Sequence, residues 1–357
     1  MKLKTLHLNL DLIESLKEFS NKTYKKGYFL SDIKYVNWWF QDNPHNTNSK
    51  KNQSMVAVVK NKIIGFQGRI PTTLRYEQQK VPAHWWCNMM VLPQYRNTGV
   101  GPLLAKACLE EFPDSACIGY NSGANAILDR LGFNLFGHKK LRRAIYTAEP
   151  SVLKSLMVSD DTIKTLKSVS FSNLVKKKLD IERINTIDND FDDLWERVHF
   201  RYGLTCDRTS KHLKWRFLYH PTIDYHVLST VGSRNAVAVL RFEGNPKEFG
   251  FVARIVDFYC EKEVAAAFLK AVVEYAQTRN VIMIDFYCSK AIDLEAFKQN
   301  SFHWLKAPEC IPYLFNPLEK REIWEECFGI HLLCLKEFKK FVYEDVYFVK
   351  ADGDRDR

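Results

Sequence analysis

An arginine and two glycines, Arg96, Gly99 and Gly101, follow one another at short spacing in the segment PQYRNTGVG. Glycine allows backbone conformations and close approaches that a side chain would forbid, so neighbouring N–H groups can point into one concavity. If a helix begins here, the concavity also lies at the positive end of the helix dipole, where anions bind. The residues therefore favour a cradle for a pyrophosphate. An ordinary glycine turn, with Pro102 as a helix-start proline, would explain the same residues.

The flanking segments predict the elements that hold this loop. PAHWWCNMMVL (82–92) is rich in aromatic, Met and Val residues, as expected of a strand covered on both faces. PLLAKACLEEF (102–112) has an apolar stripe at helical spacing and predicts an amphipathic helix. SACIGYN (115–121) predicts a second buried strand, and NSGANAILDRLGFNLFG (121–137) predicts a short helix that ends at Gly132, followed by another strand. The loop thus joins a strand to a helix.

This order of strand, R-x-x-G-x-G loop, helix, strand, asparagine, helix and L-G-F resembles the Gcn5-related N-acetyltransferase (GNAT) superfamily over residues 55–147. The resemblance implies that the loop binds the pyrophosphate of acyl-coenzyme A through its backbone amides. It also implies that the pantetheine arm pairs with the strand edge before the loop and contacts the asparagine after the second strand. The residues so assigned to the coenzyme are Met89, Met90, Val91, Arg96, Asn97, Thr98, Gly99, Val100, Gly101 and Asn121. Acetyl-CoA, or another acyl-CoA, is therefore the expected co-substrate.

The sequence departs from the family pattern at three positions. Asn97 stands where a glycine often follows the arginine, so the loop takes a somewhat different path. Pro102 removes one N–H group that could reach a phosphate. Leu128 lies seven residues after Asn121, where family members that use a tyrosine general acid carry it. These departures weaken the expectation of the usual acid more than the expectation of coenzyme binding.

Acyl transfer to an amine requires a deprotonated amine, a polarised thioester carbonyl and a proton for the departing sulfur. His84, on the strand that enters the loop, has a near-neutral intrinsic pKa and is the base candidate there, although a strand-end histidine without a catalytic role is the plainer interpretation. Tyr120 lies close to Asn121 and could replace the missing acid.

The second half of the chain resembles a copy of the first. YVNWWFQDNP (35–44) and HLKWRFLYHP (212–221) share Trp, Phe and Pro at matching places, and both precede a predicted strand pair. FVARIVDFYC (251–260), an amphipathic helix and VIMIDFYC (281–288) repeat the strand–helix–strand order. Between strand and helix the second copy reads CEKEV, with two acids and no glycine, so it is not expected to hold a pyrophosphate.

We therefore predict an α/β protein with tandem GNAT-like domains, each a mixed, twisted sheet flanked by helices. The expected division is an acyl-CoA-binding domain over 1–150, a helical and basic linker over 151–190, and a degenerate domain over 191–357 with an acceptor-binding or structural role.

Acidic residues in the second half offer further candidates for the site. Asp257 and Asp285 interrupt apolar strands, and they either form salt bridges, with Arg254 or Lys290 as partners, or bind the acceptor amine. Asp257 is accordingly the third catalytic candidate, after His84 and Tyr120. The C-terminal EDVYFVKADGDRDR is expected to be a solvated tail. Together with W-R-F-x-x-H-P, this tail is similar to segments of two-domain acetyltransferases associated with bacterial surface polysaccharides.

Composition narrows the function. The net charge of +10 favours anionic partners, but the basic residues cluster only in HKKLRR and KKK, which suits small anions better than nucleic acid. The nine cysteines form no C-x-x-C pair, no apolar run has membrane-spanning length, and no metal or G-x-S-x-G motif occurs, so we expect a cytoplasmic protein without a metal or membrane partner. The sequence predicts an N-acyltransferase for the amine of a small molecule, with an amino sugar or a nucleotide-linked amino sugar of bacterial surface polysaccharide synthesis as the candidate acceptor. A Fem-type aminoacyl-tRNA-dependent peptidyltransferase and a non-catalytic acyl-CoA-binding protein remain the alternatives.

Overall fold

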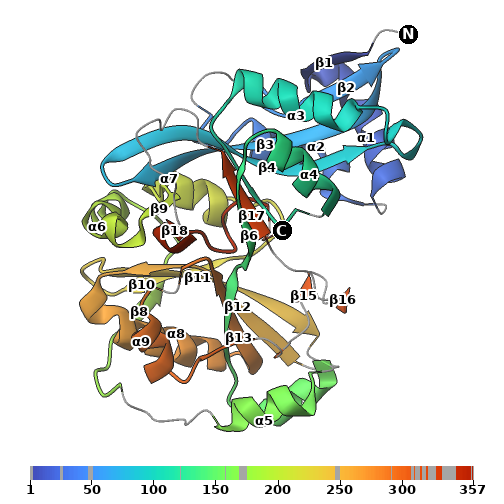
Figure 1. The fold of residues 1–357 in the computed structure, drawn as a ribbon. Coiled ribbons are helices and arrows are strands. Elements are labelled where there is room, and N and C mark those ends of the chain that lie inside the picture. Colours follow the sequence, from blue (N-terminus) through green and yellow to red (C-terminus); the bar gives the residue numbers. More distant parts are fainter. Residues whose placement is uncertain are drawn as a thin grey trace. The chain divides into compact units, whose positions relative to one another are not determined.

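The computed structural model describes residues 3–24, 27–46, 51–120, 122–156, 158–168, 175–245, 250–290, 292–306, 309, 314–315, 319–320, 327–331, 343–354 and 356. The chain forms two compact units, which are described separately (Figure 1). The first comprises residues 1–139, 326–342 and 353–355, and the second comprises residues 140–325, 343–352 and 356–357.

The first unit is built on a mixed sheet with the strand order β1-β2-β3-β4-β5-β17-β6. Neighbours from β1 to β4 are antiparallel, β4 and β5 are parallel, and β17 is antiparallel to β5. Its strands are β1 (Lys4–His7), β2 (Met55–Val59), β3 (Lys62–Tyr76), β4 (Gln79–Val91), β5 (Ser115–Ile118), β6 (Asn134–Lys140) and β17 (Cys327–His331). Its helices are η1 (Leu10–Leu12), α1 (Ile13–Thr23), η2 (Phe29–Ser31), α2 (Ile33–Phe40), η3 (Pro93–Tyr95), α3 (Val100–Glu111) and α4 (Ser122–Arg130).

Close packing of α3 on the sheet depends on a glycine in β3. A Cβ atom added at Gly65 would lie 2.9 Å from Leu104 Cδ1 and 3.0 Å from a methyl of Val100, both on α3. A larger residue would push away the first turn of α3, which belongs to the predicted phosphate cradle. The predicted strand, loop and helix around the glycine motif are confirmed as β4, the turn that includes η3, and α3.

The second unit has a mixed sheet with the order β14-β7-β13-β12-β11-β10-β8. Strands β12 and β13 are parallel, and the other neighbours are antiparallel. The strands of this unit are β7 (Arg142–Tyr146), β8 (Ile181–Arg183), β9 (Leu204–Cys206), β10 (His226–Thr230), β11 (Ala236–Asn245), β12 (Gly250–Cys260), β13 (Val281–Cys288), β14 (His303–Trp304), β15 (Leu314–Phe315), β16 (Glu319–Lys320) and β18 (Val346–Tyr347). The helices are η4 (Pro150–Leu156), α5 (Asp160–Ser168), α6 (Asp190–Val198), η5 (His199–Tyr202), α7 (Ser210–Leu213), η6 (Lys214–Leu218), η7 (Lys262–Val264), α8 (Ala265–Gln277), α9 (Leu294–Gln299) and η8 (Tyr343–Asp345).

Both units follow one order of elements, and each takes a strand from the other half of the sequence. Three antiparallel strands, a helix and a parallel strand appear as β2-β3-β4-α3-β5 and again as β10-β11-β12-α8-β13. Beside β5 lies β17, in which Phe328 pairs with Ile118. Beside β13 lies β7, in which Ile145 pairs with Asp285. The two halves therefore exchange one strand each.

This exchange corrects the predicted boundaries. The N-terminal part of the first unit ends at residue 139 rather than 150, because β7 pairs with β13 and so belongs to the second sheet. The predicted linker is also part of the second unit, since Leu153, Ile163 and Leu166 pack in one buried cluster with Ile145 and Met283. Local patterns could not reveal either point, because both depend on pairing partners far away in the sequence.

The C-terminal segment of the second unit is buried, so the prediction of a solvated tail was wrong. Asp352 is 5% exposed and Asp356 is fully buried. Asp352 contacts the Arg208 guanidinium at 3.2 Å, and Arg241 contacts Asp356 at 2.7 Å. The Tyr225 hydroxyl donates a hydrogen bond of 2.5 Å to Asp356 Oδ2. These alternate aspartates are anchors of the segment.

A fragment that ends at residue 150 tests the strand exchange. It lacks β17, so the backbone groups of the buried strand β5 lose the partner that spans Ser115 to Ile118. We expect this fragment to aggregate or to unfold without a cooperative transition, as measured by urea denaturation and size-exclusion chromatography. Co-expression with residues 151–357 should restore a soluble complex. A monomeric fragment with cooperative unfolding would contradict the exchange.

Candidate functional site

Strand β4 is interrupted by a β-bulge shortly before it ends. Phe66 pairs with Met90 and Gly68 pairs with Cys87. Between these two pairs, β4 contains one residue more than β3. Asn88, inside the bulge, has a φ of 53°, in the left-handed region. A bulge of this kind turns backbone groups out of the regular ladder. The sequence offers one signal for it, an asparagine among apolar residues near the end of the strand.

Strands β4 and β5 part at the same place. Their parallel pairing covers His84 to Trp86 on β4, and within the described residues it goes no further. From Met90 to Val91, β4 remains paired to β3 on its other side. The edge of β4 that faces β5 can therefore pair with an extended ligand that carries amide groups, in the way a peptide adds to a sheet edge. Met89, Met90 and Val91 are half-buried at this end of β4, and their role in binding a ligand stays a prediction.

The glycine loop follows directly and leads into the N-terminus of α3. Asn97 has a φ of 61° and Gly99 a φ of 85°, so two left-handed residues bend the chain sharply. The first intrahelical bond runs from Leu103 N–H to the Gly99 carbonyl at 3.0 Å. The preceding N–H groups of the first turn lie ahead of the helical ladder and are the groups that bind anions at helix N-termini.

The loop side chains leave room for a ligand. Arg96, Asn97, Thr98 and Gly99 are exposed, whereas Val100 is buried and fixes the start of α3. A Cβ atom at Gly99 would meet nothing within 4 Å, so glycine is required there by the backbone conformation and not by crowding.

Arg96 returns to the strand that precedes it. Its Nε donates a hydrogen bond of 3.3 Å to the Val91 carbonyl, and one terminal nitrogen lies 3.9 Å from the Met90 sulfur. Thr98 Oγ1 donates to the Tyr95 carbonyl at 2.7 Å and closes the turn. Arg96 thus ties the loop to the end of β4.

Two tyrosines that sequence reasoning missed, one at the C-terminal end of α1 and one before η2, contact the bulge. The Tyr28 hydroxyl donates to Asn88 Oδ1 at 2.6 Å, and the Tyr24 hydroxyl donates to the Asn88 carbonyl at 3.3 Å. Their rings stack at a centroid distance of 4.0 Å. The two tyrosines in the largely polar segment NKTYKKGYF were the available signal.

His84 lies in the core rather than in an open site. It is 7% exposed, its ring packs on Phe112 at a centroid distance of 4.4 Å, and its backbone N–H donates to the Asp114 carbonyl. Burial, reinforced by the nearby charge of Arg69, lowers the pKa of His84 to about 3. Such a group is a weak base, and this environment favours the interpretation of a packing residue.

The other positions that the sequence singled out in this unit are Tyr120, Asn121 and Leu128. Tyr120 is half-buried just beyond β5, and Asn121 lies outside the described residues. Leu128 on α4 is buried, so an apolar side chain occupies the position of the family's tyrosine.

Asp257 and Asp285 are both buried in ion pairs of the second unit. Asp257 receives two bonds from Arg208 Nε, at 3.0 and 2.9 Å, and burial together with Asp352 raises its pKa to about 6 despite the arginine. Asp285 contacts Arg143 at 2.7 Å and the predicted partner Arg254 at 3.8 Å. Although burial raises the pKa of Asp285, these guanidinium groups outweigh it and hold that pKa below its usual range. The salt-bridge interpretation thus accounts for both residues.

In the second unit, the parallel strands β12 and β13 also part, and the C-terminal segment of the chain lies along them there. Pairing of β12 with β13 ends at Ile255 and Phe286. Beyond it, the Ala351 N–H donates to the Val256 carbonyl at 3.0 Å, and Val349 bridges to Cys288. The C-terminal segment therefore lies along β12 and β13 beyond the end of their pairing.

Further features bear on partners and chemistry. In the described part of the chain, no helix is long and apolar enough to cross a membrane, and no group of three or more His, Cys, Asp or Glu is placed to hold a metal ion. The cysteines with described side chains, Cys87, Cys108, Cys117, Cys206, Cys260 and Cys288, are free thiols.

His84→Gln separates packing from catalysis through pH. With a folded pKa of about 3 and an unfolded pKa of 6.5, the unfolded chain binds a proton first as pH falls, so His84 costs stability below pH 6.5. We expect the wild type to lose about 2 kcal/mol more unfolding free energy than the variant between pH 7 and pH 5. Urea denaturation at both pH values measures this difference. Equal losses in both proteins would contradict the buried, neutral state.

Comparisons with known proteins found one matching family and several similar structures. Residues 13–133 match the model of the acetyltransferase (GNAT) family. A GCN5-related N-acetyltransferase from Anabaena variabilis superposes with a TM-score of 0.59 at 14% identity, covering 93% of this chain and 74% of that one. One from Kribbella flavida has a TM-score of 0.56 at 14% identity, covering 92% and 70%. Saccharomyces cerevisiae N-myristoyltransferase with bound myristoyl-CoA has a TM-score of 0.53 at 13% identity, covering 92% and 78%.

A search of curated proteins gave no match. At these identities the structural neighbours establish the fold, and the family match covers the segment that contains α1, the bulge of β4 and the glycine loop. The chain has the mixed α/β fold of these acyltransferases, and by its residues 13–133 and its structural neighbours it resembles the GNAT superfamily.

Proposed function

We propose that the protein is an acyl-CoA-dependent N-acyltransferase, with acetyl-CoA as the acyl donor. The observation that carries the proposal is the continuous path along β4, from the bulge at Asn88, past the edge that parts from β5, to the glycine loop at the N-terminus of α3. Along this path, backbone groups can pair with the amides of the pantetheine arm of coenzyme A. The path ends at a helix N-terminus, where the pyrophosphate of coenzyme A can bind.

The proposed binding mode assigns a task to each segment. The amides from Thr98 to Gly101 bind the pyrophosphate, with Arg96 beside them, and Asn97 shapes the loop through its left-handed backbone. The edge from Met89 to Val91 pairs with the pantetheine amides, and Asn121 contacts the same arm. The thioester then lies at the bulge, where an N–H group outside the ladder can polarise its carbonyl.

Transfer proceeds by direct attack of the acceptor amine on the thioester carbon. A C–N bond forms, the C–S bond breaks, and the amine proton must leave while the sulfur gains one. Tyr120, just beyond β5, is our candidate to protonate the sulfur. His84 and Asp257 are set aside as bases, because the first packs in the core and the second is held by Arg208. Positioning therefore supplies most of the rate.

The acceptor is an amine on a small molecule, such as an amino sugar, and the nucleotide-linked form of such a sugar, which is anionic, suits the net charge of +10. A cytoplasmic location is part of the proposal, since the described cysteines are unbridged. The second unit, whose C-terminal segment fills its own strand opening, is assigned a structural or acceptor-binding role, as a duplicated domain that has lost the coenzyme site.

Gly101→Glu tests the cradle. A Cβ at this position would lie 3.8 Å from Ile127 and 3.9 Å from Val91, so the fold tolerates a side chain while a carboxylate enters the anion site. We expect acetyl-CoA affinity to fall by on the order of a hundredfold or more, measured by calorimetry, because like charges repel at short range. Leu103→Glu adds the same charge to the same helix at a position that is 40% exposed, and should bind normally. Equal affinities of the two variants would refute the assigned cradle.

The reaction itself is tested by following thiol release from acetyl-CoA with a panel of amines, amino sugars and nucleotide-linked amino sugars. The proposal expects release with at least one amine, and its loss in Gly101→Glu but not in Leu103→Glu. Tight acetyl-CoA binding without release on any amine would instead favour a non-catalytic acyl-CoA-binding protein, which buried Leu128 and His84 make the second candidate.

A further inference from the structure

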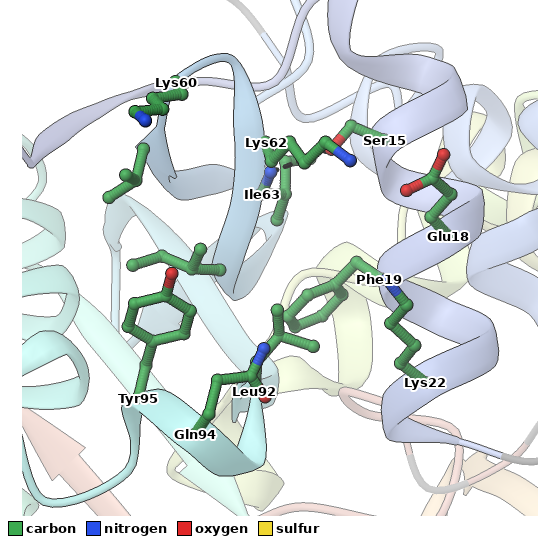
Figure 2. A pocket seen from close by; sticks show the side chains of 12 residues that line it. Ser15, Glu18, Phe19, Lys22, Lys60, Lys62, Ile63, Leu92, Gln94 and Tyr95 are labelled. Carbon is green, nitrogen blue, oxygen red and sulfur yellow. Dashed lines mark hydrogen bonds between the residues drawn. The ribbon is translucent and has the colours of Figure 1, made fainter.

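A cavity of about 350 Å³ lies in the first unit, on the side of β3 that carries α1 (Figure 2). Ser15, Glu18, Phe19 and Lys22 contribute one face of α1 at helical spacing. The hairpin turn between β2 and β3 supplies a second wall, and the chain from Leu92 to Tyr95 supplies the third. Its volume is at the lower end for small-molecule sites, so a compact ligand fits it.

The cavity is held by specific bonds and does not require a ligand to form. The Ile63 N–H donates to Ser15 Oγ at 2.8 Å, which fixes α1 on the hairpin. The Leu92 N–H donates to the Ile64 carbonyl at 2.9 Å, which fixes the third wall. Lys60 and Asn61 are both left-handed, as in a tight hairpin turn. Binding here would therefore cost little ordering of the protein.

The lining combines positive charge with an apolar floor. Lys22, Lys60 and Lys62 are exposed residues of the lining, which contains a single carboxylate, that of Glu18, and so has a net charge of +2. Within the described chain, none of these three ammonium groups forms an ion pair. Phe19, Ile63 and Leu92 are among the buried side chains of the floor.

The aromatic ring of Tyr95 stands at the opposite side of the cavity from Lys22 (Figure 2). Lysine binds phosphate as a point charge, and a tyrosine ring offers a face on which a planar base can stack. A dianionic phosphate monoester matches the net charge of +2 better than a single carboxylate does. The combination of one ring, three lysines and an apolar floor therefore suits a nucleotide.

We propose that this cavity is a binding site for a nucleotide phosphate monoester. Two sources share this chemistry. One is the 3′-phosphoadenosine end of coenzyme A, because Tyr95 is followed directly by Arg96 of the glycine loop; in this form the inference rests on the proposed function. The other is a separate nucleotide, such as the carrier of a nucleotide-linked acceptor.

The test uses the full chain and a variant that combines Lys22→Gln, Lys60→Gln and Lys62→Gln. A matched control combines Lys4→Gln, Lys34→Gln and Lys51→Gln, which removes the same charge from exposed positions outside the cavity. Calorimetry measures binding of adenosine monophosphate, which requires no acyl transfer. We expect the cavity variant to lose on the order of tenfold in affinity and the control to stay within about twofold, because hydrogen bonds to charged groups are strong.

Coenzyme A and dephospho-coenzyme A then identify the source. If the cavity variant no longer prefers coenzyme A over its dephospho form, the site holds the coenzyme's 3′-phosphate. If this preference is unchanged while adenosine monophosphate binding is lost, the site serves a separate nucleotide, and the inference stands independently of the coenzyme.

Two results would overturn the inference. One is equal adenosine monophosphate affinity in the cavity and control variants, or no measurable binding in the wild type. The other is loss of that binding in Gly101→Glu with full retention in the cavity variant, since the phosphate would then lie in the glycine loop. Failure of the proposed function looks different, because it appears as absent thiol release and leaves nucleotide binding unaffected.

Discussion

Two parallel strands that part before they end leave backbone N–H and C=O groups without a neighbouring strand, and these groups must find partners. Both units have such a pair of strands, β4 with β5 and β12 with β13. In the second unit the chain supplies partners through residues 348–351. In the first unit the strand edge leads to a glycine loop at a helix N-terminus, and a bound coenzyme arm would supply them. The same fold thus produces one filled opening and one candidate site.

Charge keeps the second opening filled. Arg208 bonds both Asp257 on β12 and Asp352 on the C-terminal segment, while Asp356 is held by Arg241 and Tyr225. Buried ions cost desolvation, and this cost is offset only where several partners satisfy each charge, as they do here. Removing one partner would leave an uncompensated buried charge, so the network fixes one arrangement of the segment. The aspartates thereby act in structure, and the proposed function places its catalytic groups in the first unit.

The sequence predicts local structure well where one element determines it. Apolar periodicity locates β4, α3, β12 and α8, and the glycine of the motif at position 99 has the positive φ that its residue type suggests. Features that depend on distant partners were missed. The pairing of β5 with residues 327–331 joins segments about two hundred residues apart, and no local pattern encodes it.

The environment of a side chain is likewise not predictable from the sequence where it depends on distant residues. His84 resembles a base by residue type, yet Phe112 and burial determine its state. Tyr24 and Tyr28 become relevant only because the bulge at Asn88 lies beside them. The alternate aspartates of the C-terminus look solvated until Arg208 and Arg241 are placed opposite them. In each case the chemistry depends on tertiary contacts that residue type does not specify.

The central claim is that one of two similar units retains a coenzyme site. Calorimetric titration of the full chain with acetyl-CoA tests it most directly, because the number of sites does not depend on the acceptor or on turnover. The account predicts saturation at one equivalent per chain. Saturation at two equivalents would show that residues 348–351 do not block the second opening, and the absence of saturable binding would show that the glycine loop is an ordinary turn.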